Sequence, residues 1–169
     1  MTIQVGDKVP DIALTTMTAE GPAPVTSAEL FAGKKVVLFA VPGAFTPTCS
    51  AKHLPGFVGN ADAIKAKGVD TVACISVNDP FVMGAWGNDQ SVGSNVLMLA
   101  DGSAAFNKAM GLDWDLSAKG LGLRSQRYAM IVEDGTVTHL AVEEAGVFDV
   151  SSAESVMSEI GRASCRERV

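Results

Sequence analysis

Residues Val36–Cys49 read VVLFAVPGAFTPTC, and this stretch decides the fold. Its first part, Val36–Val41, is a continuous apolar run, which is typical of a strand that is buried on both faces. The residues that follow, Ser50–Lys67, are typical of a helix that ends at Gly68. The sequence therefore predicts that Cys49 lies at a strand-to-helix turn, on the first turn of the helix.

This predicted position favours a reactive sulfur. The N–H groups of a first helical turn have no intrahelical acceptor, and the positive end of the helix dipole lies there as well. Both effects stabilise a thiolate relative to a thiol, and the thiolate is the nucleophilic form of cysteine. We therefore interpret Cys49 as reactive, the alternative being the small buried hydrophobic role that cysteine often has.

The spacing Pro42-x-x-x-Thr46-x-x-Cys49 resembles the active-site signature of the peroxiredoxins. The longer string around it resembles the type-five (atypical type II) subfamily within the redoxin/AhpC-TSA superfamily. The resemblance covers about residues 3–157. The segments that carry it are Val41–Ser50, His53–Phe57, Val72–Asp79 and Gln126–Met130.

The resemblance implies a thioredoxin-like fold and a thiol-dependent peroxidase activity. Such an enzyme reduces hydrogen peroxide and alkyl hydroperoxides through a sulfenic acid on its reactive cysteine, here Cys49. We expect no cofactor. The alternative is a thioredoxin-fold redox sensor or chaperone that passes oxidation to a partner protein. A disulfide reductase would need a Cys-x-x-Cys pair, whereas Lys52 stands three residues after Cys49.

Strands alternate with helices along the chain, which predicts an α/β fold with a mixed central sheet flanked by helices. A long Gly-containing segment, Leu112–Leu123, is expected to be a loop. The predicted strands are Ile12–Thr16, Val36–Val41, Thr71–Val77, Val96–Ala100 and a hairpin of Tyr128–Glu133 with Thr136–Val142 about Asp134-Gly135. The predicted helices are Ser27–Phe31, Ser50–Lys67 with a kink at Pro55, one opened by Asp79 and Pro80, Ser103–Met110 capped by Ser103, and a last one opened by the capping box Ser151–Glu154.

Composition narrows the function classes. The chain has 169 residues, 47% of them hydrophobic, and a net charge of −6, so one domain with a good core is expected. The negative charge argues against nucleic acid or an anionic membrane as a partner. No stretch approaches the roughly 20 apolar residues of a membrane span. The first ten residues lack a signal-peptide pattern, which favours the cytosol.

The last ten residues, 160–169, resemble the translation of a common sequencing-adapter oligonucleotide. They are basic, and the helical pattern before them is predicted to stop near Ile160. We therefore expect a single domain over residues 1–159, a non-native tail over 160–169 and a missing native C-terminus.

Attack of a thiolate on a peroxide builds negative charge on the departing oxygen, so the site needs fixed donors and a cation. The backbone N–H groups of Thr48 and Cys49 are the expected donors. By resemblance, Arg127 supplies a permanently charged guanidinium. Thr46 would donate and accept with its hydroxyl, and Pro42, which lacks an N–H, would shield the sulfur from water.

His53 stands four residues after Cys49, on the same helical face. It is a candidate base of a catalytic Cys-His pair, or it shapes the pocket, or it has a structural role. A metal site would need more ligands than this pair, and none is expected. Four apolar residues are candidates for the pocket or for a subunit contact, with core packing as the alternative: Phe45, Phe81, Trp86 and Leu121. The resemblance implies a homodimer formed through the face beside the active-site loop.

Two-cysteine members of the resembled subfamily carry a resolving cysteine near the start of the final helix. Here that region, Phe148–Ala153, has no cysteine, and Cys165 belongs to the expected tail. Cys74 is predicted to be buried and inert in a strand. We therefore expect a one-cysteine enzyme that is reduced again by an external thiol. The expected reductant is either thioredoxin or the pair of glutathione and glutaredoxin.

Overall fold

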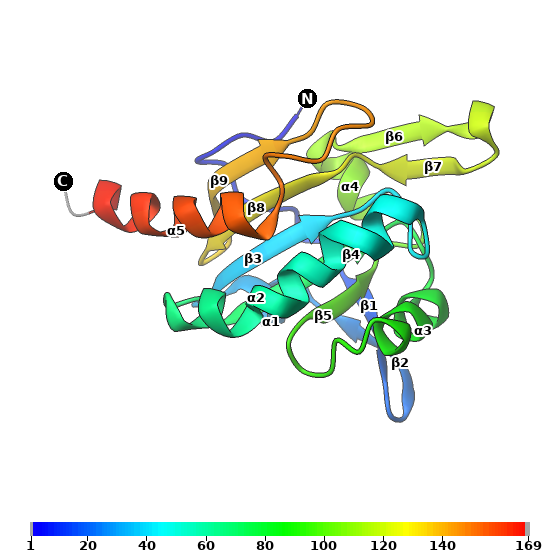
Figure 1. The fold of residues 1–169 in the computed structure, drawn as a ribbon, viewed down its shortest axis with the longest axis horizontal. Helices are drawn as coiled ribbons and strands as arrows, with labels where there is room; N and C mark the ends of the chain where they lie inside the picture. The colour runs from blue at the N-terminus through cyan, green and yellow to red at the C-terminus, as the bar shows by residue number, and fades with distance from the viewer. Residues whose placement is uncertain (1, 168–169) are drawn as a thin grey trace.

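The structure, a computed structural model, describes the backbone of residues 2–167 and the side chains of residues 2–160. Within this range a seven-stranded mixed sheet runs through the molecule in the order β2-β1-β5-β4-β3-β8-β9 (Figure 1). The parallel centre is β3, β4 and β5, and β1 and β8 add to it antiparallel. The strands are β1 (Leu14–Thr18), β2 (Gly21–Val25), β3 (Lys35–Ala40), β4 (Thr71–Ser76), β5 (Leu97–Ala100), β8 (Tyr128–Glu133) and β9 (Thr136–Val142).

Helices cover both faces of this sheet. One face packs on α2, α3 and α5, and the other on α1 and α4. The predicted mixed α/β sheet flanked by helices, with a thioredoxin-like fold, is thereby confirmed. The helices are α1 (Ser27–Phe31), α2 (Leu54–Ala66), α3 (Pro80–Asp89), α4 (Ala105–Met110) and α5 (Ala153–Glu167), and a π-helical turn, η1 (Cys49–His53), leads into α2.

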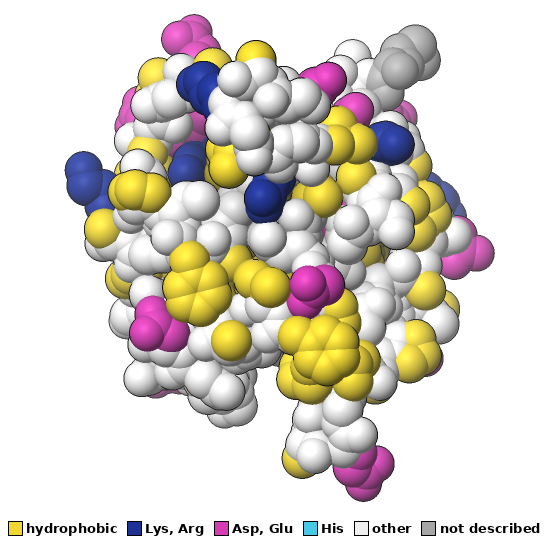
Figure 2. Space-filling view, turned by 90° about the vertical axis from the view of Figure 1, so that its right-hand side faces the viewer, with side chains coloured by type: hydrophobic (Ala, Val, Ile, Leu, Met, Phe, Trp, Pro, Cys, Tyr) yellow, Lys and Arg dark blue, Asp and Glu magenta, His cyan; other side chains and the backbone are white. Residues whose placement is uncertain are grey.

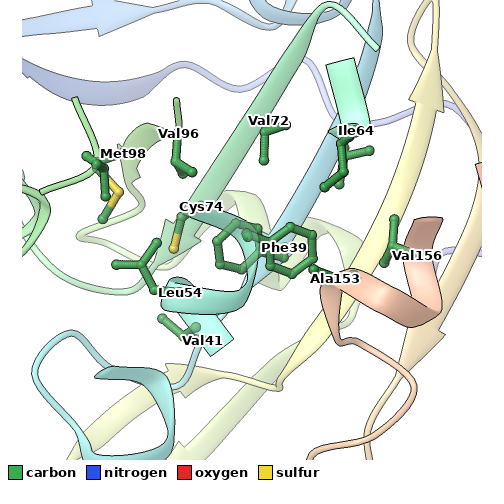
Figure 3. Close-up of a cluster of buried hydrophobic side chains, with 14 of the residues drawn as sticks. Phe39, Val41, Leu54, Ile64, Val72, Cys74, Val96, Met98, Ala153 and Val156 are labelled. Carbon is green, nitrogen blue, oxygen red and sulfur yellow. The ribbon is translucent and has the colours of Figure 1, made fainter. Parts of the chain in front are cut away.

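Strand β3 is buried on both faces, as its unbroken apolar run predicts. Val37 and Phe39 point into the cluster under α2 and α5, while Val36 and Leu38 point into the cluster on the opposite face. Figure 3 shows the first cluster, in which Phe39 meets side chains from the helices and from the neighbouring strands. The end of β3 is thus a rigid platform for the loop that follows it.

Several predicted boundaries are confirmed. Helix α1 and the β8–β9 hairpin have the predicted bounds. Asp79 caps α3, because its carboxylate accepts a hydrogen bond from the Val82 N–H at 2.8 Å.

Two predictions in the second half of the chain are wrong. Ser103 does not cap α4; the helix begins at Ala105, and the buried carboxylate of Asp101 accepts from the N–H groups of Phe106 and Asn107. The segment Leu112–Leu123 is not a loop. It holds β6 (Asp113–Leu116), a 3₁₀ turn η2 (Ser117–Lys119) and the start of β7 (Gly122–Ser125), which form a small antiparallel sheet. Positive φ angles at Gly120 and Gly122, 75° and 70°, reverse the chain between the strands.

The start and end of α5 also differ from expectation. The capping donor–acceptor pair is Ser152 Oγ with the Ser155 N–H, at 3.2 Å, and not the predicted Ser151–Glu154 box. The backbone of α5 continues to Glu167, beyond the predicted end near Ile160. The side chain of Cys165 lies outside the described residues.

Candidate active site

The loop after β3 is held in place by polar contacts to neighbouring strands. The Ala44 N–H donates to Asn78 Oδ1 at 3.1 Å, and Ser76 Oγ donates to the same oxygen at 2.6 Å. Phe45 has a φ of 64°, a strained value for a large side chain. A side chain at Gly43 would fit tightly, because its Cβ would lie 3.1 Å from Thr46 Cγ2 and 3.3 Å from an Arg124 nitrogen, and these side chains would have to shift. The loop conformation is therefore fixed by its surroundings.

The helix starts directly after this loop. The Ser50 N–H donates to the Thr46 carbonyl at 2.9 Å, which makes this the first bond of the helical ladder. The N–H groups of Thr48 and Cys49 precede it and so have no acceptor within the helix. Cys49 therefore lies on the first turn.

The turn from Cys49 to His53 is wider than an α-helix. The Leu54 N–H donates to the Cys49 carbonyl five residues earlier, and Pro55, which has no N–H and crowds the preceding turn, follows at once. The predicted irregularity at Pro55 therefore takes the form of a π turn rather than a kink within an α-helix. Cys49 and His53, at the two ends of the turn, are both fully buried.

Arg127 lies against Cys49. It immediately precedes β8, and because Tyr128 pairs with Ala40, the last residue of β3, Arg127 comes beside the loop that follows β3. One guanidinium nitrogen, Nη2, donates to Cys49 Sγ at 3.1 Å, and the other, Nη1, lies 2.8 Å from His53 Nδ1. A guanidinium stays charged at any working pH, so this contact stabilises a thiolate.

The contacts of His53 define its tautomer. Arginine can only donate, so Nδ1 accepts from Arg127, and Nε2 then carries the hydrogen that it donates to the Ser151 carbonyl at 3.0 Å. Burial, followed by the neighbouring Arg127 charge, lowers the pKa of His53 from 6.5 to about 3. His53 is therefore neutral, and the nitrogen that a base would use is occupied by Arg127.

A cavity of about 540 Å³ opens beside the guanidinium. Pro42, Thr48, Lys52 and Arg127 line it on one side, and the segment Glu143–Phe148 lines it on the other. Thr46 is not among the residues that line the cavity; its hydroxyl hydrogen is donated within the loop, to the Gly43 carbonyl at 2.7 Å.

Three candidates from the sequence lie elsewhere. Phe45, Phe81 and Leu121 do not line this cavity, and their side chains are exposed, by 53%, 65% and 39%. Figure 2 shows hydrophobic side chains gathered on the side of the molecule that carries the active-site loop and α3. The Phe45 ring lies 6.4 Å from that of Trp86, which is buried and donates to Ser50 Oγ.

Cys74 lies in β4 opposite Phe39 and is fully buried. Burial raises the pKa of its thiol, and the nearby Cys49 raises it further. Cys74 is therefore held as a thiol. Among the described residues, no group of three or more His, Cys, Asp or Glu side chains could hold a metal ion, and no described helix has the length and hydrophobicity to cross a membrane.

Sequence reasoning missed two residues beside the site. Glu143 accepts hydrogen bonds from the turn that carries Ser151, and the Phe148 ring lies 5.0 Å from the His53 ring and 5.9 Å from Arg127 Cζ. No spacing distinguishes Glu143 from its exposed neighbour Glu144, so only the tertiary structure identifies it.

Comparisons with known proteins agree with this geometry. The sequence matches the Redoxin family over residues 4–157. It is 54% identical to Peroxiredoxin-2E-2, chloroplastic, of Oryza sativa subsp. japonica, over 94% of this chain and 73% of that protein. It is 49% identical to Peroxiredoxin-2E, chloroplastic, of Arabidopsis thaliana, over 94% and 69%.

A solved structure of similar sequence has the same fold. Reduced Prx3 of Vibrio vulnificus, in complex with H₂O₂, superposes with a TM-score of 0.90 at 55% identity, and the match covers 94% of this chain and 99% of that one. With sequence and fold in agreement over nearly its whole length, the chain belongs to the peroxiredoxins of the redoxin family and is a peroxidase oxidoreductase.

Proposed function

We propose that the chain reduces hydrogen peroxide and alkyl hydroperoxides at Cys49 in a one-cysteine cycle. The contact that carries the proposal is the 3.1 Å hydrogen bond from Arg127 to Cys49 Sγ, beside an open cavity. The thiolate attacks one peroxide oxygen and the O–O bond breaks. Cys49 becomes a sulfenic acid, and the other oxygen takes a proton and leaves as water or an alcohol.

The surrounding groups have distinct roles in this step. Arg127 and the N–H groups of Thr48 and Cys49 stabilise the charge on the departing oxygen where it develops. The Thr46 hydroxyl oxygen accepts a hydrogen bond from the peroxide, and Pro42 keeps water from the sulfur. The complex of the Vibrio vulnificus relative with H₂O₂ supports hydrogen peroxide as a substrate.

The return half of the cycle needs a thiol from outside the chain. The region Phe148–Ala153 has no cysteine, and Ser151 and Ser152 stand where a resolving cysteine is expected. Cys74 is fully buried in a central strand. Glutathione with glutaredoxin, or thioredoxin, is the proposed reductant. The motif around Cys49 supports assignment to the type-five subfamily. Three further statements remain predictions from the sequence: a domain over residues 1–159, a non-native origin of residues 160–169, and a cytosolic location.

We further propose a homodimer formed through the exposed apolar face. We assign Phe45, Phe81 and Leu121 to this face because they are large hydrophobic side chains that are exposed, and exposed hydrophobic patches commonly mark an interface. A redox sensor or chaperone remains the second candidate, and catalytic turnover of peroxide with added thiol separates it from the enzyme.

The buried neutral state of His53 predicts a pH dependence of stability. The unfolded side chain binds a proton near pH 6.5, whereas the folded one does so only near pH 3. The free energy of unfolding therefore falls as the pH falls from 6.5 towards 3, with His53 contributing up to about 1.4 kcal/mol per pH unit. Urea unfolding between pH 6.5 and 5, in a His139→Gln background with and without His53→Gln, should show a shallower slope without His53. Equal slopes would contradict the assignment.

Substitution of the cysteines tests the reacting sulfur. Cys49→Ser should abolish peroxide consumption in the presence of glutathione or dithiothreitol, because serine is a far weaker nucleophile at neutral pH. Cys74→Ser and Cys165→Ser should keep most of the activity. Turnover retained by Cys49→Ser would exclude Cys49 as the site of reaction.

Mass spectrometry of the intact Cys165→Ser protein tests the one-cysteine cycle. One equivalent of hydrogen peroxide without thiol should add one oxygen atom, and further peroxide should add more. With glutathione present, one glutathione per chain should appear at Cys49. A loss of two hydrogens after one equivalent would instead show a disulfide between Cys49 and Cys74.

Sedimentation tests the dimer. The wild-type protein should sediment as a dimer, and Phe81→Asp should shift it towards the monomer because a charge would be buried in the interface. Val5→Asp is the matched control, since Val5 is similarly exposed, at 59%, but lies in the N-terminal segment beside β9. A wild-type monomer at high concentration would refute the proposed interface.

A further inference from the structure

Glu143 is a buried carboxylate directly after β9. It is 7% exposed, and in the described part of the chain no lysine or arginine forms an ion pair with it. Its oxygens instead accept four hydrogen bonds from one short turn. The donors are the N–H groups of Asp149 at 2.6 Å, Val150 at 3.2 Å and Ser151 at 3.0 Å, and the Ser151 hydroxyl at 2.7 Å.

These hydrogen bonds keep the carboxylate charged. Burial alone raises the pKa of Glu143, but the donors from Asp149, Ser151 and Val150 outweigh it and lower the pKa below its ordinary value. Burying a charged carboxylate costs free energy, and here the hydrogen bonds from the turn at residues 149–151 offset that cost.

The held turn continues into the active site. Its Ser151 carbonyl accepts the His53 Nε2 hydrogen, the opposite ring nitrogen accepts from Arg127 Nη1, and Nη2 of the same guanidinium donates to Cys49 Sγ. The backbone N–H of Glu143 also donates to the Arg127 carbonyl at 2.9 Å. Glu143 therefore contacts Arg127 in two ways. Its backbone N–H holds the Arg127 backbone, and its carboxylate, through Ser151 and His53, orients the Arg127 side chain.

We propose that Glu143 is a positioning residue of the peroxidase site: through Ser151 and His53, its carboxylate holds the Arg127 guanidinium on the Cys49 sulfur. This inference rests on the proposed reaction at Cys49. Glutamine is a poorer acceptor there, because it has no charge and its amide NH₂ would face the Val150 N–H that now donates to Oε1, even with its one oxygen on the three donors at Oε2.

The first experiment is a double-mutant cycle. The rate constant of Cys49 oxidation by hydrogen peroxide is measured in a single turnover for wild type, Glu143→Gln, His53→Gln and the double variant. Each single variant should be slower by about tenfold or more, as is typical when a partner that orients a reactive group is lost. The double variant should be no slower than the slower single variant, because both break the same chain of contacts. Glu154→Gln, which removes an exposed carboxylate in the first turn of α5, should react as wild type does.

Two outcomes of this cycle would overturn the inference. An unchanged rate in folded Glu143→Gln would show that the carboxylate does not position Arg127. Effects that multiply in the double variant would show that Glu143 and His53 act independently, as expected for a purely structural role. If Glu143→Gln does not fold, Ser151→Ala is the second variant, because it removes one of the four hydrogen bonds to Glu143. It should slow the oxidation of Cys49 by a smaller factor, and an unchanged rate in Ser151→Ala would contradict the positioning role of Glu143.

The second experiment does not depend on the reaction. The ¹⁵N shifts of the His53 ring distinguish a nitrogen that carries hydrogen from one that accepts. In wild type, Nδ1 should show the accepting value and Nε2 the protonated one, and in Glu143→Gln the two should move towards an average. Unchanged shifts would refute the positioning role. A wild-type protein that fails to react with peroxide but shows this shift change would refute the proposed function and leave the hydrogen-bond chain established.

Discussion

The Arg127 guanidinium, divided between the Cys49 sulfur and the His53 ring, is the interaction on which the rest of the site depends. A guanidinium has several donors in a fixed plane, so two of its nitrogens can be committed at once. The antiparallel pairing of β8 with β3 brings the arginine to the helix start, and the π turn brings both acceptors inward. The order of the strands and the geometry of the helix start together place the Arg127 guanidinium between Cys49 and His53.

The sequence predicted correctly those features that are determined by a few adjacent residues. The apolar run of β3, the hairpin at Asp134-Gly135 and the capped start of α3 each follow from a few adjacent residues, and the structure has them. The motif around Cys49 also indicated the reacting sulfur. Arg127, by contrast, was reached through the resemblance to a family and not from its own neighbours, because a single arginine before a strand carries no signal of where the strand will lie.

One error and one omission both involve a buried carboxylate. Asp101, rather than Ser103, accepts from the N–H groups of Phe106 and Asn107 in α4, and Glu143 accepts from the turn before α5. Such substitutions are invisible to spacing rules. Phe45, Phe81 and Leu121 do not line the cavity for which they were candidates, because a linear sequence does not say which side of a loop faces a cavity.

The π turn from Cys49 to His53 makes the site sensitive to chain length. Its five-residue bond contains one residue more than an α-helical turn would. Removing any single residue between Cys49 and His53 would restore a regular helix and rotate the sulfur by about 100° relative to α2. The cysteine would then leave the plane of the guanidinium although every side chain of the motif remained. In this segment, therefore, the geometry of the site depends on the number of residues as well as on their types.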